Sequence, residues 1–153
     1  MFLAGVTAHP VRPWVTQQAR NLVVALEDQG RAVRFLVRDR DTKFVGPFDE
    51  VLRSTGDRVI KTPVRSPRAN AFAERFVRTA RAECVDWLLI RSERHLDGVL
   101  REFVTHYNHE RPHRGLDLDA PVPCSARRQF ESGDRVERAD RLGGLLHEYH
   151  LAA

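Results

Sequence analysis

The sequence has 153 residues, of which 42% are hydrophobic, and a formal net charge of +4. This length and composition suit one globular domain and argue against a disordered chain. No run of about eighteen apolar residues and no secretory signal pattern occurs, so we expect a cytoplasmic protein without a membrane span. The two cysteines lack metal-ligand spacing, which favours reduced thiols over a zinc site or a disulfide.

Arginine makes up 23 of the 25 basic residues, because Lys43 and Lys61 are the two lysines. Arginine forks suit phosphate groups better than lysine point charges do, so this bias is compatible with a nucleic-acid partner. Codon usage in a GC-rich genome would produce the same bias without such a partner. Composition alone therefore leaves the function open.

The first part of the chain alternates strands and helices. The elements expected in chain order are a strand at 1–9, a helix at 14–29 that stops at Gly30, a buried strand at 32–38, a helix at 47–54 and a strand at 58–62. This order favours an α/β layer with a partly parallel sheet.

Two amphipathic helices are expected next. Asn70 is a good N-cap for the first helix, and its apolar face is predicted to hold Phe72, Phe76, Val77, Ala80, Cys84 and Leu88. Ser92 caps the second helix, with an apolar face of Leu96, Val99, Leu100, Phe103, Val104 and Tyr107. Trp14 and Trp87 are predicted to be core residues, and Cys84 an inert buried thiol.

The C-terminal part has a different character. We expect a core domain at 1–122 and a charged tail at 123–153. Within the tail, residues 125–140 lack a clear hydrophobic period and are interpreted as a solvated stretch or a weak helix. Residues 142–149 form a small apolar patch that is expected to dock on the core.

Two acidic residues suggest a chemical site. Asp39 follows a strand, and Glu74 lies in the first turn of the helix after the next strand. Open α/β sheets gather functional groups at the carboxyl ends of their strands, and Mg²⁺ prefers carboxylate and phosphate oxygens. The pair predicts a Mg²⁺ (or Mn²⁺) site for phosphodiester chemistry. Taken alone, Glu74 reads as a helix-stabilising acid, and Asp41 competes with Asp39, although a turn role suits Asp41 better.

Three motifs carry a resemblance to a known family. They are DRDTKF at 39–44, SPRANAFAER at 66–75, and His106-Tyr107-Asn108 with Arg111-Pro112-His113 and Leu116. In this order the motifs are highly specific, and 34 residues separate Asp39 from Glu74. The stretch from Val33 to Pro121 resembles the C-terminal part of the catalytic core of DDE transposases and retroviral-type integrases of bacterial insertion sequences.

The resemblance implies a ribonuclease H-like α/β core, in which a mixed sheet is flanked by helices. It implies that Asp39 and Glu74 are the second and third carboxylates of the catalytic triad and bind Mg²⁺ or Mn²⁺. The family's first two strands and first catalytic Asp have no counterpart in this sequence, so it resembles an N-terminally truncated core. We therefore expect an open sheet edge that could pair with another chain.

The resemblance also implies that the partner is DNA, both element ends and target, with the protein on the bacterial nucleoid when DNA is bound. The expected DNA contacts are Arg65, Arg68, Arg75, Arg78, Arg81, Arg111 and His113, although such arginines could equally form a solvated face. His106, His109 and His113 could be imagined as a zinc site, but no cysteine or acid completes it.

The sequence thus predicts an integrase or transposase core fragment for DNA integration and transposition, a polynucleotidyl transferase by family. We expect it to be inactive alone, because the first catalytic Asp is absent. One alternative is a non-enzymatic DNA-binding or interfering fragment that pairs with a second copy or with a full-length transposase. The other is a decayed gene remnant.

Overall fold

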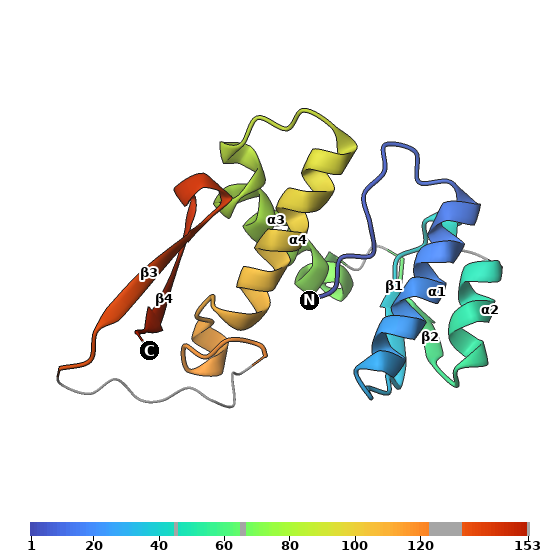
Figure 1. Cartoon of the computed structure of the whole chain (residues 1–153). Helices are drawn as coiled ribbons and strands as arrows, with labels where there is room; N and C mark the ends of the chain where they lie inside the picture. Colours follow the sequence, from blue (N-terminus) through green and yellow to red (C-terminus); the bar gives the residue numbers. More distant parts are fainter. Residues whose placement is uncertain (45, 65–66, 123–132, 153) are drawn as a thin grey trace. The chain divides into compact units, whose positions relative to one another are not determined.

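The computed structural model describes residues 1–44, 46–64, 67–122 and 133–152, without the side chains of residues 67 and 68. The chain divides into an N-terminal unit, Phe2–Thr79, and a C-terminal unit that combines Met1 with Ala80–Ala153 (Figure 1). Each unit has helices and a two-stranded sheet, which confirms the expected mixture of α and β structure. Among the described residues, none of the helices has the length and apolar character that a membrane span requires.

The N-terminal unit packs two helices against a small parallel sheet. Its elements are α1 (Arg12–Asp28), β1 (Phe35–Arg38), α2 (Pro47–Ser54) and β2 (Arg58–Lys61). Helices α1 and α2 lie side by side (Figure 1), and their buried side chains Val15, Ala19, Phe48 and Leu52 form the core. Leu36 of β1 and Val59 of β2 pack against this core, so helices cover one face of the sheet.

Proline and glycine residues mark the ends of several elements in this unit. Helix α1 begins at Arg12 with Pro13 in its first turn, where a missing N–H costs nothing, and Gly30 follows its end with a φ of 61°. Helix α2 has the predicted bounds, and β2 ends one residue before the predicted 62. These predictions are confirmed, except that α1 begins two residues before the predicted 14 and ends one residue before the predicted 29.

One strand prediction in this unit is wrong, and another is confirmed only in part. Residues 1–9 form no strand, because no described strand pairs with them, and Met1 instead exchanges hydrogen bonds with both amide atoms of Asn108. The strand at 32–38 is shorter and less buried than predicted, since Phe35 and Val37 are 49% and 53% exposed. Alternate residues of a strand point to opposite faces, and the described helices cover only one face.

Helix α3 (Ala71–Glu83) shows that an amphipathic pattern does not guarantee burial. Ala80 and Cys84 are buried as predicted, but Phe72 is 86% and Val77 56% exposed. The helix ends at Glu83 and does not reach Leu88, and the Asn70 side chain makes no hydrogen bond in the described part. The period of a sequence shows which side of a helix is apolar, whereas burial also needs a neighbour to cover it.

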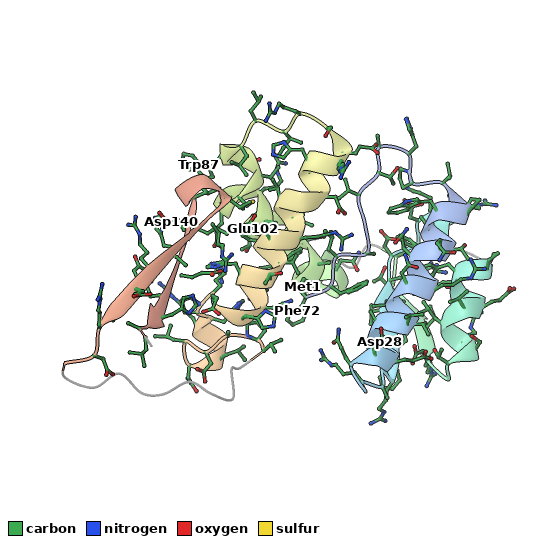
Figure 2. All side chains as sticks on the ribbon, viewed as in Figure 1. Met1, Asp28, Phe72, Trp87, Glu102 and Asp140 are labelled. Carbon is green, nitrogen blue, oxygen red and sulfur yellow. The ribbon has the colours of Figure 1, made fainter. Side chains whose placement is uncertain are left out.

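The expectations for Trp87 and Cys84 have opposite outcomes. Trp87, in a short 3₁₀ turn after α3, is 72% exposed, so the prediction of a core residue is wrong (Figure 2). Its Nε1 donates to the Ala82 carbonyl at 2.7 Å, which holds the ring against its own turn. Cys84 is fully buried, and burial raises the pKa of its thiol to about 11, as expected for an inert cysteine.

The C-terminal unit is built around α4 (Glu93–His109). Its predicted cap is confirmed, because the Ser92 side chain accepts a hydrogen bond from the His95 amide at 3.1 Å. Val99, Phe103 and Val104 on the predicted apolar face are buried. This helix is therefore the best predicted part of the C-terminal unit.

An antiparallel hairpin, β3 (Val136–Arg141) and β4 (Leu146–Leu151), follows α4. Residues 136–140 form a strand, so the prediction of an irregular stretch or weak helix is wrong for them, although all except Ala139 are exposed, as a solvated stretch would be. His147 lies 2.7 Å from Asp140 directly opposite it, and Arg141 Nε donates to Glu148 at 2.9 Å. Cys124 and residues 125–132 lie outside the described residues, so the domain boundary after 122 stays a prediction.

The expected docking of residues 142–149 is confirmed. The Leu142 amide donates to the Glu102 carboxylate on α4 at 3.3 Å, and both Glu102 and the hairpin are seen in Figure 2. Leu146 is 8% and Glu148 5% exposed, whereas Tyr149 is exposed. The hairpin thus contacts α4 through polar groups, from the Leu142 amide to Glu102 and from Glu148 to His106, while Leu146 is buried.

Candidate functional site

Asp39 is half-buried and follows β1 directly. Its Oδ1 accepts a hydrogen bond from the Asp41 amide at 3.0 Å, which forms an Asx turn, and its carbonyl accepts from Arg38 Nη1 at 2.8 Å. In the described part of the chain, Oδ2 of Asp39 makes no hydrogen bond. The turn therefore fixes the backbone and Oδ1 of Asp39 and leaves its Oδ2 open.

Asp41, the competing acid, has both oxygens occupied by Lys43. Oδ1 accepts from the Lys43 amide at 2.9 Å, and Oδ2 lies 3.1 Å from Lys43 Nζ. The hydrogen bond from the Lys43 backbone, with the charge beside it, holds the pKa of Asp41 below its usual value. Both acids thus accept an Asx-turn hydrogen bond, and the second oxygen distinguishes them: that of Asp41 pairs with Lys43, whereas that of Asp39 is open among the described residues.

Glu74 is exposed in the first turn of α3 and has no hydrogen bond or ion pair within the described residues. Asp39 and Glu74 thus both offer open carboxylate oxygens, the donor type that Mg²⁺ and Mn²⁺ prefer. No partner is shared by the two residues, so their joint site stays a prediction. Within the described ranges, no group of three or more His, Cys, Asp or Glu side chains could hold a metal ion.

The arginines predicted to contact DNA fall into distinct environments. Arg75 and Arg78 on α3 are exposed and have no partner in the part of the chain that the structure describes. Arg81 pairs with Asp86, Nε to Oδ1, at 3.2 Å. Arg65 lies outside the described residues, as does the side chain of Arg68.

Arg111 and His113 have structural contacts in the C-terminal unit. Nε and Nη2 of Arg111 donate to both oxygens of Glu83, at 2.7 and 2.6 Å, and its guanidinium lies 5.5 Å from the centre of the Tyr107 ring. His113 packs edge-on against the same ring at 4.6 Å. These contacts hold the segment after α4 to the end of α3, and a role of either residue in DNA binding stays a prediction.

The three histidines considered for zinc make separate contacts. His106 Nδ1 lies 3.3 Å from Glu148, His109 Nδ1 lies 3.0 Å from the Thr105 carbonyl, and His113 Nε2 lies 3.2 Å from the Tyr107 carbonyl. Burial alone would raise the pKa of Glu148, but hydrogen bonds from Arg141 and His106 hold it below its ordinary value. Sequence reasoning missed this network, because 42 residues separate His106 from Glu148.

Sequence reasoning also missed a buried ion pair beside Asp39. Arg38, the last residue of β1, and Asp49, in the first turn of α2, are 6% and 4% exposed. Arg38 Nε and Nη2 donate to the two oxygens of Asp49, both at 2.8 Å, and this holds the pKa of Asp49 below its usual value. One sequence signal was available, since an arginine ends an apolar strand and would need a partner if buried.

Residues 56–121 match the family model of the integrase core domain. This match confirms the resemblance to an integrase or transposase catalytic core and indicates a role in DNA integration. The matched stretch contains Glu74 and the arginines of α3, whereas Asp39 precedes it. Comparison with curated proteins and with solved structures finds no match.

Proposed function

We propose that this chain contributes to metal-dependent cleavage and strand transfer of DNA, with Asp39 and Glu74 as ligands for Mg²⁺ or Mn²⁺. The observation that carries the proposal is the open carboxylate oxygens of these two residues, one of them inside the integrase-core match. Two carboxylates together with phosphate oxygens form a common ligand set for Mg²⁺. The metal, when bound, supplies activation of an oxygen nucleophile and stabilisation of charge on the phosphate.

The chain's own residues supply binding and orientation. Arg78 and Arg81 follow Glu74 at helical spacings of four and seven residues, so they lie on its side of α3. Arginine side chains there would neutralise DNA phosphates next to the ligand carboxylate. Cleavage by this polypeptide alone is expected to be slow, because two carboxylates form a smaller ligand set than the triad of the family.

The test is nicking of a supercoiled DNA circle with Mn²⁺ or Mg²⁺. We expect Asp39→Asn and Glu74→Gln each to reduce the rate by about 10²-fold or more, since each removes charge stabilisation from the transition state. Asp41→Asn is the matched control, because Lys43 already occupies both Asp41 oxygens. Binding of Mn²⁺ by the wild type that is no tighter than in the Asp39→Asn/Glu74→Gln double variant would rule the site out.

Binding of DNA without cleavage is the second candidate, and the exposed, unpartnered Arg75 and Arg78 favour it within the described structure. Phe72, labelled in Figure 2, is 86% exposed and precedes Arg75 by three residues on α3, and arginines combined with an aromatic ring suit single-stranded DNA. This function predicts DNA binding that survives Asp39→Asn and Glu74→Gln.

The dependence of DNA affinity on salt concentration tests each arginine of α3 separately. Each of Arg75→Gln and Arg78→Gln should reduce the slope of log affinity against log salt by about 0.7–0.9, if each residue neutralises one phosphate. Arg94→Gln, which removes an exposed and unpartnered arginine of α4, is the control. Phe72→Ala should weaken binding of single strands, whereas Leu89→Ala, at a residue 84% exposed, should not. Equal slopes for all three arginine variants would exclude α3 as the DNA-binding face.

A further inference from the structure

The Arg38–Asp49 pair is more elaborate than the packing of the N-terminal unit requires. The side chains are 4% and 5% exposed, so both charges are removed from water. Well-packed hydrophobic residues commonly stabilise a core as well as a buried ion pair does, because desolvation offsets much of the attraction. The pair therefore calls for a function that apolar side chains could not perform.

The third nitrogen of Arg38 indicates that function. While Nε and Nη2 are held by Asp49, Nη1 donates to the carbonyl oxygen of Asp39 at 2.8 Å. A guanidinium is planar and rigid, so fixing two of its nitrogens also fixes the direction of the third. The Asp39 peptide is thereby oriented from α2, through a side chain that does not itself reach the open Oδ2.

Further hydrogen bonds hold the same turn. The Arg38 carbonyl accepts from the Thr62 amide at 2.8 Å, and Arg40 Nε donates to the Thr62 carbonyl at 2.9 Å, which joins the ends of β1 and β2. The Asp41 amide donates to Asp39 Oδ1. Backbone and side-chain contacts together leave Oδ2 as the oxygen of Asp39 that is open in the described structure.

We propose that the Arg38–Asp49 pair is a positioning device that orients the Asp39 carboxylate for metal binding. Arg38 and Asp49 are positioning residues, because they act through Asp39 and do not touch the metal or DNA. This inference rests on the proposed function, in which Asp39 is a ligand. It adds that α2, an element outside the integrase-core match, controls the affinity of the site.

The direct test is the affinity of the full chain for Mn²⁺, measured by electron paramagnetic resonance of the free ion. Arg38→Lys keeps the charge but cannot bind both Asp49 oxygens and the Asp39 carbonyl. Asp49→Asn keeps the shape but loses one acceptor. Each should weaken Mn²⁺ binding by about 10–100-fold, the effect typical of residues behind a metal ligand.

Arg101→Lys is the matched control. Nε and Nη2 of Arg101 donate to the two oxygens of Asp97, at 2.6 and 3.1 Å, within the C-terminal unit, and neither residue has a proposed role in metal or DNA binding. This variant should bind Mn²⁺ as the wild type does. Circular dichroism at the temperature of the titration checks that each variant is folded. Folded Arg38→Lys and Asp49→Asn proteins with wild-type Mn²⁺ affinity would overturn the proposal.

A second readout needs no metal and so separates this inference from the proposed function. The Asp41 amide reports the orientation of Asp39 through its hydrogen bond to Oδ1. In the wild type it should exchange with solvent at least about tenfold more slowly than the Arg40 amide, which has no acceptor in the described part. Arg38→Lys should remove that difference, whereas Arg101→Lys should keep it.

Mn²⁺ affinity and Asp41 amide exchange test different claims, so one claim can be excluded while the other stands. If Asp39→Asn binds Mn²⁺ as tightly as the wild type but Asp41 amide exchange depends on Arg38, the metal site is wrong and the orientation of the turn by Arg38 stands. If the wild-type Asp41 amide exchanges as fast as that of Arg40, Asp39 is not held and the positioning role is excluded. That last measurement uses the wild type and does not depend on whether any variant folds.

Discussion

Each of the two units buries a carboxylate at the centre of a charged network, and the two networks differ in kind. Asp49 in the N-terminal unit lies 2.8 Å from Arg38, and both side chains are almost fully removed from water, whereas its second partner, the exposed Arg53, lies 3.5 Å away. Glu148 in the C-terminal unit is as buried, but its nearest partner, at 2.9 Å, is Arg141, which is 49% exposed, and His106 lies 3.3 Å away. The nearest opposite charge is therefore buried in the first network and half-exposed in the second.

The largest expected effect is loss of the buried partner in the N-terminal unit. Asp49→Ala leaves Arg38 buried without its carboxylate and should lower the free energy of unfolding by about 3–5 kcal/mol. Urea unfolding followed by Trp14 fluorescence, in a Trp87→Phe background, measures this. Glu50→Ala, at the next and exposed residue of α2, should stay within about 0.5 kcal/mol of the wild type. Similar effects of the two substitutions would refute a special role for Asp49.

Removing the carboxylate of the C-terminal network should have a smaller effect. Glu148→Ala leaves the buried His106 side chain without its hydrogen-bond partner, whereas Arg141 is half-exposed and can turn to water, so we expect a loss of about 1–3 kcal/mol. The loss should appear as faster hydrogen exchange in the hairpin. Glu137→Ala, at an exposed position of β3, is the control. Unchanged hairpin protection in Glu148→Ala would show that the apolar contacts alone hold the hairpin.

Acid should weaken the Glu148 network. Because its folded-state pKa lies below the ordinary value of 4.5, the ionised carboxylate contributes stability that is complete above that value and lost as pH falls through the folded-state pKa. The difference in unfolding free energy between wild type and Glu148→Gln should therefore shrink on going from about pH 6 to about pH 3. A difference that stays constant over this range would exclude a contribution from ionised Glu148.

The smallest effect is expected at the partly exposed fork between Arg111 and Glu83, whose side chains are 26% and 39% exposed. Solvent screens this pair, so Glu83→Gln should cost about 0–1 kcal/mol, with less effect in high salt. Thermal unfolding at two salt concentrations measures it. A loss as large as that of Asp49→Ala would show that burial is not what distinguishes the two forks.

Much of the fold could be predicted wherever the signals are local. Helix α2 runs from Pro47 to Ser54 as predicted, because a proline begins it and Gly56 follows it. The hairpin could not be predicted, since its charged side chains are paired by a strand register that local sequence does not encode. Apolar patterning alone puts Phe72 on an apolar helix face and Trp87 in the core, but both are exposed, since burial depends on which elements cover them.

The candidate site also combines residues that the sequence reveals with residues that it does not. Asp39, Asp41 and Glu74 could be selected from the sequence, because strand ends and helix starts are local features. The Arg38–Asp49 pair that holds Asp39 could not be predicted, since these two residues are 11 positions apart and meet only when α2 packs on the sheet. His106 and Glu148 illustrate the same limit at a longer separation. The joint placement of Asp39 and Glu74 stays a prediction.

The fully buried thiol of Cys84 is a built-in reporter of local opening. With a pKa of about 11 and no exposed surface, Cys84 should react with a thiol reagent only when the segment between α3 and α4 transiently opens. In a Cys124→Ser background, the labelling rate would measure how often this happens. Comparing that rate with and without DNA would show whether binding stabilises the C-terminal unit, with no cysteine introduced as a probe.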